Sequence, residues 1–180
     1  MKILLSGAQC VGKTTLINSL KSMHPNWVYF DEIVRKLAQK GIKVSEMGDD
    51  ETQIAIMKEH LLNLECNAPW AVYDRGVLDC YAHSAWMYSH GKLSRDVFVK
   101  SEKDFTDNIM KYDYVFFIMP EFDIVDDGFR SVSKEFQNEM SDIFLGILYA
   151  AGIKHTRLWG SVVERLKQIH ASMGLNCPGL

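Results

Sequence analysis

The stretch SGAQCVGKTT, at residues 6–15, has the residue types and the spacing of a phosphate-binding loop. It matches the pattern G-x-x-x-x-G-K-[ST] at four positions, Gly7, Gly12, Lys13 and Thr14. Glycines let such a loop curl so that backbone N–H groups point at phosphate oxygens, and the positive end of the following helix adds to the attraction. The apolar run KILL before the loop and a helical pattern after it disfavour the alternative, a glycine-rich turn with a solvated lysine. The stretch therefore predicts a site for a nucleoside triphosphate.

Each residue type in this loop has an expected partner. Lys13 would reach the β- and γ-phosphates, Thr14 would place its hydroxyl on Mg²⁺, and Thr15 would support the loop from the first helical turn. The expected donor-binding residues of the loop are Gly7, Ala8, Gln9, Cys10, Val11, Gly12, Lys13, Thr14 and Thr15. ATP and Mg²⁺ are accordingly the expected cofactors.

A second group of polar residues lies in WAVYDRGVLDC, where an apolar strand ends at a carboxylate and a guanidinium. Asp74, at the carboxyl end of a strand beside the phosphate loop, can hold the magnesium shell. Arg75 can fork onto a phosphate or a substrate hydroxyl, and Asp79 follows one helical turn later. We expect a metal ligand at Asp74, a catalytic role for Arg75, and substrate contacts at Arg75 and Asp79. The alternative is a simple turn in which Asp74 caps the helix and Arg75 pairs with Asp79.

A third group lies in VYFDEIVRK, where the second expected strand ends in two acids. Because the carboxyl ends of parallel strands border the ligand crevice, Asp31 or Glu32 could accept a proton from an attacking hydroxyl. Arg35, one turn after Glu32, is a candidate substrate contact. Alternatively, Asp31 is a helix N-cap and Glu32 is a first-turn acid favoured by the helix dipole.

The segment DDGFRSVS, after the apolar strand YVFFIM, has a turn that presents Arg130. An arginine on a lid over the triphosphate would neutralise the charge that develops during phosphoryl transfer and would exclude water. We therefore expect a lid around residues 120–133. The alternative is a solvated arginine before a helix that Ser131 or Ser133 caps.

Gly160 and Ser161 follow the fifth expected strand, at the edge of the same crevice. Their backbone groups could contact the adenine ring of the donor. A simple turn, with Ser161 as the N-cap of the next helix, explains them equally well.

The segment VLDCYAHSAWMYSHGK, which follows Arg75 and Gly76, is rich in aromatic residues. Tyr81 and Tyr88 are seven residues apart and would share one face of a helix. Tyr81 and Trp86 are candidates for stacking on a substrate base, although core packing is the more common role of such a stripe.

These residues must be positioned by an alternation of strands and helices that runs from one end of the chain to the other. The expected strands are Lys2–Ser6, Trp27–Phe30, Trp70–Tyr73, Tyr114–Met119 and Lys154–Leu158. The expected helices are Lys13–Met23, Ile33–Gln39, Glu51–Glu65, Val77–His90, Asp96–Lys111, Ser133–Ala151 and Ser161–Met173. This order predicts an α/β fold with helices on both faces of a parallel sheet.

Composition places the chain among soluble globular proteins. It has 180 residues, 47% of them hydrophobic, and a formal net charge of -3. Its apolar runs are shorter than the roughly 20 residues needed to cross a bilayer, so no membrane partner is expected. Four scattered cysteines indicate neither a zinc site nor a disulfide framework. We expect one domain at residues 1–174, a flexible tail at residues 175–180, and a cytoplasmic monomer or homodimer.

Taken in order, the glycine-rich loop, DEIVR, DRGVLD and DDGFR resemble the P-loop kinase superfamily. The chain looks most like the small AAA-type ATPase-like kinases near the nicotinamide riboside, deoxynucleoside and thymidylate kinases. That resemblance implies a three-layer α/β/α sandwich with a five-stranded parallel sheet in the order 2-3-1-4-5. It also implies that Lys13 and Thr14 contact the triphosphate and magnesium, that Glu32 or Asp31 is the base, and that Arg130 is the lid arginine. The chain departs from many relatives in having one arginine in the lid core.

The favoured hypothesis is a kinase that moves the γ-phosphoryl group of ATP to a hydroxyl of a nucleoside- or nucleotide-type acceptor. The second hypothesis rests on a resemblance to phage-type kinases that phosphorylate the hydroxymethyl group of a modified base, 5-hydroxymethyluracil, within DNA. Such a protein would act in the host cytoplasm. The net charge of -3 gives no signature of polyanion binding, which disfavours a DNA substrate. A third hypothesis, a nucleotide-binding switch or ATPase without kinase activity, remains because a phosphate-binding loop alone does not fix the chemistry.

Overall fold

The computed structural model describes residues 1–31, 33–34, 48–122, 124 and 133–177 of the chain. Its centre is a five-stranded sheet in the order β2-β3-β1-β4-β5, and each neighbouring pair of strands is parallel. The strands are β1 (Lys2–Ser6), β2 (Val28–Phe30), β3 (Ala71–Asp74), β4 (Tyr114–Ile118) and β5 (Thr156–Leu158). The expected sheet and its strand order are therefore confirmed.

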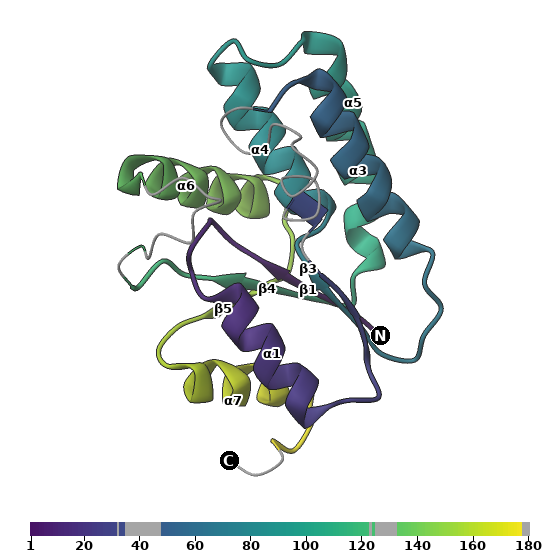
Figure 1. Cartoon of the computed structure of the whole chain (residues 1–180), viewed down its shortest axis with the longest axis vertical. Helices are drawn as coiled ribbons and strands as arrows, with labels where there is room; N and C mark the ends of the chain where they lie inside the picture. Colours follow the sequence, from purple (N-terminus) through teal and green to yellow (C-terminus); the bar gives the residue numbers. More distant parts are fainter. Residues whose placement is uncertain (32, 35–47, 123, 125–132, 178–180) are drawn as a thin grey trace.

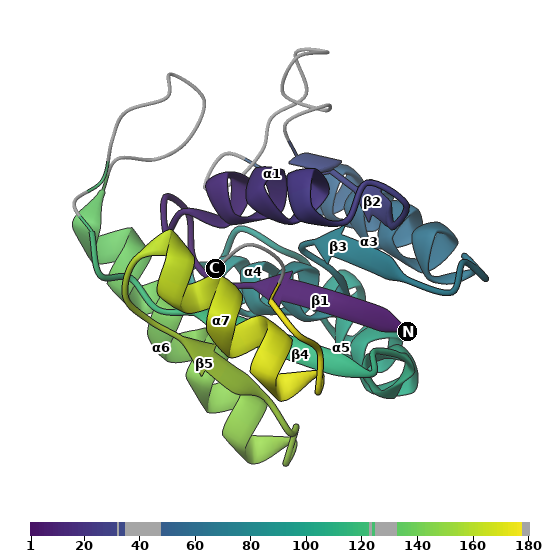
Figure 2. The ribbon, with the colours of Figure 1, turned by 90° about the horizontal axis from the view of Figure 1, so that it is seen from below.

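Helices cover both faces of the sheet (Figures 1 and 2). On one face lie α1 (Lys13–Met23) and α7 (Val162–Ser172). On the other face lie α4 (Val77–Ser89) and α6 (Lys134–Ala150), and α3 (Asp50–Leu64) and α5 (Arg95–Asn108) pack beside α4. A short 3₁₀ helix, η2 (Ile109–Lys111), follows α5. These layers confirm the predicted fold class.

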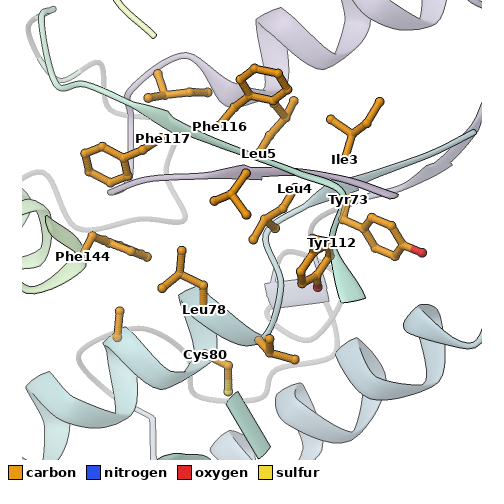
Figure 3. Packing of buried hydrophobic residues seen from close by; sticks show 14 of the residues in the cluster. Ile3, Leu4, Leu5, Tyr73, Leu78, Cys80, Tyr112, Phe116, Phe117 and Phe144 are labelled. Carbon is orange, nitrogen blue, oxygen red and sulfur yellow. The ribbon is translucent and has the colours of Figure 1, made fainter. Parts of the chain in front are cut away.

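The hydrophobic core lies between the sheet and these helices. Leu4 of β1 pairs with Tyr73 of β3 and with Val115 of β4, and all three side chains are buried. Figure 3 shows Leu78 of α4 and Phe144 of α6 pointing towards the sheet from one side. The central strands read as continuous apolar runs because helices cover both of their faces.

The boundaries of most elements lie within two residues of the predicted ones. β3 ends at Asp74 rather than one residue earlier, so this carboxylate belongs to the strand. The expected helix from residue 33 to residue 39, the core of the expected lid and the last three residues of the expected tail lie largely or wholly outside the described residues. Among the helices that the structure describes, none combines the length and the apolar character needed to span a membrane.

Candidate phosphate-binding site

The phosphate loop joins the end of β1 to the start of α1, as predicted. Gly7 has a φ of 145°, and a Cβ added to it would lie 2.8 Å from the backbone oxygen of Ile118 in β4. Gly12 is the N-cap of α1 with a φ of 89°. Both values lie in a region that side chains disfavour, so glycine is required for the curl at each end of the loop. Cys10 has a φ of 58°, which makes the loop a strained segment at its centre as well.

Two cations bind the carbonyl groups at the start of the loop. The Lys13 ammonium donates to the backbone oxygens of Gly7 and Ala8 at 2.8 and 2.6 Å. The Arg75 guanidinium, just after the end of the neighbouring strand β3, donates to the Gly7 oxygen at 3.1 Å. Lys13 is therefore held at the loop itself, within reach of any anion that binds there.

Two side chains from distant helices bind carbonyl groups further along the loop. Gln137 of α6 donates from Nε2 to the backbone oxygen of Gln9 at 2.8 Å. Arg165 of α7 donates from Nη1 to the backbone oxygen of Val11 at 2.7 Å. Donors thus satisfy four of the loop's carbonyl oxygens, and these bonds fix the orientation of its peptide groups.

The N-terminus of α1 differs from those of the other described α-helices, each of which has a side chain that accepts a backbone N–H at its start. Asp49, Ser94, Ser133 and Ser161 each accept a backbone N–H at the start of α3, α5, α6 and α7. Within the described part of the chain, α1 has neither a side-chain cap nor an acidic residue in its first turn. The positive end of α1 and the N–H groups of its first turn therefore favour an anion at this position.

These features fit ATP and Mg²⁺. The loop offers a glycine-lined curve, an ammonium and the positive end of a helix that is eleven residues long. Thr14 and Thr15 lie exposed in the first turn of α1, where a hydroxyl can reach a bound ion. Asp74 lies at the end of β3 in register with Leu5 of β1, one strand away from the loop. Hydroxyl and carboxylate oxygens are the ligand types that Mg²⁺ prefers.

The end of β3 carries a buried ion pair. Arg75, which has a φ of 73°, places Nη1 3.2 Å from Oδ1 of Asp79. The other oxygen of Asp79 accepts the backbone N–H of Gly76, the N-cap of α4, at 3.1 Å. Burial raises the pKa of the Asp79 carboxyl, and the charges of Arg75 and Lys13 oppose that rise. Asp79 thus caps α4 and pairs with Arg75, and Asp74 does not form the cap that the alternative interpretation assigned to it.

The candidate base lies at the end of β2. Asp31 has an exposed carboxylate whose Oδ1 is 2.6 Å from the Lys21 ammonium of α1. Glu32 and Arg35, the other two candidates in this segment, lie outside the described residues, as does Arg130 of the expected lid.

Gly160 and Ser161 lie at the start of α7, beyond the end of β5. Ser161 is the N-cap of α7 and forms a reciprocal capping box with Glu164. The backbone N–H of Gly160 donates to Oε2 of Glu121, which follows β4, at 2.7 Å. The local capping role of Ser161 is therefore present, and the proposed adenine contact stays a prediction.

The aromatic residues of α4 pack against neighbouring helices. Tyr81 and Tyr88 both stack on Phe98 of α5, which confirms that they share a face. Trp86 donates from Nε1 to Glu139 of α6 at 2.7 Å and packs edge-on against Phe136. The structure gives these side chains packing roles and records no contact between them and the phosphate loop.

Sequence reasoning missed four residues that surround the site, namely His60, Glu121, Gln137 and Arg165. His60 lies on the buried stripe of α3 that Gln53, Met57 and Leu64 also form, so its helical spacing predicts burial. Gln137 and Arg165 carry no comparable signal, since the loop that they bind is more than a hundred residues away.

The buried His60 should make the fold less stable at acidic pH. Burial, and secondarily the charge of Arg75, lowers the pKa of this imidazole from 6.5 to about 3. Because the unfolded chain then binds the proton more readily, the free energy of unfolding should fall by about 1.4 kcal/mol per pH unit below pH ~6. As the pH is lowered from about 7 to 4, the urea concentration at the unfolding midpoint should fall less steeply for His60→Asn than for the wild type. His155→Asn, at a half-buried histidine beside β5, should keep the wild-type slope, and equal slopes in all three proteins would contradict this role of His60.

A five-stranded parallel sheet in this order, with a glycine-lysine-threonine loop between its first strand and first helix, defines a P-loop fold. The chain belongs to a family described as an AAA domain, whose model matches residues 2–165. The predicted P-loop fold is therefore confirmed.

Two solved proteins illustrate the likeness in fold. The NadR protein in complex with NR is similar at a TM-score of 0.78 and 18% identity, over 99% of this chain and 53% of NadR. Deoxyadenosine kinase from M. mycoides with bound dATP is similar at a TM-score of 0.69 and 15% identity, over 97% of this chain and 100% of that kinase. The chain thus spans about half the length of NadR. A search of curated proteins finds no match.

Proposed function

We propose that this protein is a kinase that transfers the γ-phosphoryl group of ATP to a hydroxyl of a nucleoside- or nucleotide-type acceptor. The proposal rests mainly on the N-terminus of α1. Its N-cap is Gly12, which has no side chain to cap the helix, and its first turn has no acidic residue. The loop before it already has its carbonyl groups bound to donors, so its amides can serve a phosphate chain.

The donor side of the site follows from these contacts. On binding, the Lys13 ammonium would exchange the Gly7 and Ala8 carbonyls for phosphate oxygens, which carry more negative charge. Thr14 and Asp74 would hold Mg²⁺, and the bound ion would neutralise charge on the β- and γ-phosphate oxygens. The buried pair of Arg75 and Asp79 would keep this end of the site rigid.

On the acceptor side, the carboxylate of Asp31 would take the proton of the attacking hydroxyl while that oxygen bonds to the γ-phosphorus and ADP leaves. Asp31 would first have to leave Lys21. Glu32 is the alternative base, Arg35 and Arg75 are proposed substrate contacts, and Arg130 is the proposed lid arginine.

The comparisons support a small acceptor. NadR has been solved with NR and, in a second structure, with NAD and the ATP analogue AMP-PNP. The M. mycoides protein is, as its name states, a kinase of a deoxynucleoside.

Transfer of radiolabelled γ-phosphate tests the proposal. The panel would contain nucleosides, nucleoside monophosphates, nicotinamide riboside, and duplex DNA with and without 5-hydroxymethyluracil. We expect label on a small molecule, and far slower labelling with Lys13→Met. Label on modified DNA alone would contradict the small acceptor and support the DNA kinase. ATP binding without transfer to any acceptor would support the nucleotide-dependent switch instead.

A further inference from the structure

Arg165 is a buried cation in direct contact with the phosphate loop. It lies on α7, is 2% exposed, and is among the largest fully buried side chains of the described chain. Its Nη1 atom donates to the Val11 carbonyl at 2.7 Å, and a Cβ added to Gly12 would lie 3.4 Å from the same nitrogen. Arg165 therefore binds the loop at Val11, two residues before Lys13, and lies beside Gly12.

The same guanidinium also pairs with a carboxylate that follows β4. Nη2 lies 2.9 Å from Oε2 of Glu121, and this oxygen also accepts the backbone N–H of Gly160 at 2.7 Å. The exposed ring of Phe122 lies over the guanidinium, with 5.2 Å between Cζ and the ring centroid. One side chain thus joins the phosphate loop to the segments that follow β4 and β5.

The chemistry of this contact requires arginine. Burying a cation is costly unless it is paired and hydrogen-bonded, and the buried Arg165 has the partly exposed Glu121 carboxylate and the Val11 carbonyl as partners. A planar guanidinium can donate in two fixed directions at once, whereas an ammonium is a point charge. Placed behind the Val11 peptide, the arginine fixes the direction of that peptide group and of the amides beside it.

We propose that Arg165 is a positioning residue that holds the phosphate loop in the conformation that binds the triphosphate. Through Glu121, it also links the loop to the segment at Gly160, which would lie near the adenine ring of ATP. The inference rests on the proposed function in taking ATP as the donor. It adds a residue of α7 whose effect on phosphate binding passes through the backbone of the loop rather than through contact with ATP.

The test compares the binding of two probes, ATP with Mg²⁺ and inorganic tripolyphosphate with Mg²⁺, by calorimetry. Arg165→Met should raise the Kd of both probes roughly tenfold, since one hydrogen bond from a charged donor is lost from the loop. Glu121→Gln should raise the Kd of ATP more than that of tripolyphosphate. In the double variant the two effects on ATP should be less than additive, because both residues belong to one network. Arg157→Met, at an exposed arginine of β5 that contacts Tyr149, is the matched control and should bind both probes as the wild type does.

Unfolding midpoints of the same variants separate positioning from stability. If Arg165→Met unfolds more easily but binds both probes with wild-type Kd, the residue is structural and the proposal is wrong. Should Arg165→Met fail to fold, Arg165→Lys provides the comparison: weaker ATP binding in the folded variant supports the proposal, and wild-type binding overturns it.

Failure of the wild type to bind ATP would overturn the proposed donor and this inference with it. ATP binding without transfer to an acceptor would leave the test of Arg165 intact.

Discussion

Replacing Lys13 by methionine should lower phosphoryl transfer about 100- to 1,000-fold, which is the usual effect of removing one donor that meets charge developing in the transition state. Methionine keeps an unbranched apolar stem in the buried position of Lys13 but cannot donate to phosphate oxygens. The two carbonyls that accept from Lys13 would lose a charged donor as well, so ATP affinity should fall, but by less than turnover.

Turnover and ATP Kd should be measured side by side for Lys13→Met and for Lys103→Met as the control. Lys103 lies on α5 with its side chain 72% exposed and pairs with Asp107, so its variant should transfer phosphate normally. Near-normal transfer by Lys13→Met would refute the assigned role. A loss of ATP affinity with unchanged turnover would instead make Lys13 a ground-state contact.

Arg75→Ala should lower the free energy of unfolding by about 3–5 kcal/mol, because it leaves a buried carboxylate without its cation. Asp79 is 1% exposed, and Arg75 is its partner at 3.2 Å. The change also removes the bond from Arg75 to the Gly7 carbonyl, so the phosphate loop should bind ATP less well.

The pH dependence identifies the cause of that loss. Burial raises the pKa of Asp79, and removing Arg75 takes away a charge that opposes the rise. A carboxyl whose folded pKa is raised stabilises the fold at low pH and loses that contribution as pH rises through the folded pKa. The destabilisation measured by urea unfolding should therefore be smaller at about pH 5 than at about pH 8. Adding Asp79→Asn to Arg75→Ala should recover part of the stability. An Arg75→Ala protein as stable as the wild type would contradict the inferred role of the ion pair.

Short-range signals were enough to predict the frame of the site. Continuous apolar runs predicted the five strands, because strands covered on both faces need no polar side. The two glycines of the motif predicted the loop, because the backbone at Gly7 and Gly12 has positive φ values that residues with a side chain rarely adopt. Ser133 and Ser161 were weighed as helix caps, and both serve as caps, since a cap contacts N–H groups only a few residues away.

The sequence was less informative where one residue type serves two roles. Arg75 and Asp79 fit a substrate site and a buried pair equally well, and the structure places them in a buried pair. Tyr81 and Trp86 fit stacking on a base and helix packing, and the structure supplies packing partners from α5 and α6. Residue type and spacing cannot separate such roles, because the partner that decides between them lies on another element.

The sequence by itself determined the layers of the fold, the order of its elements and the phosphate loop with its lysine and threonine. These features depend on periodicity and on backbone preferences within a few residues. Only the tertiary structure decided which side chains hold the loop, namely Arg75 from β3, Gln137 from α6 and Arg165 from α7. Each of these contacts is made after the chain has closed a loop of more than sixty residues, and no local pattern records which backbone carbonyl a distant donor will meet.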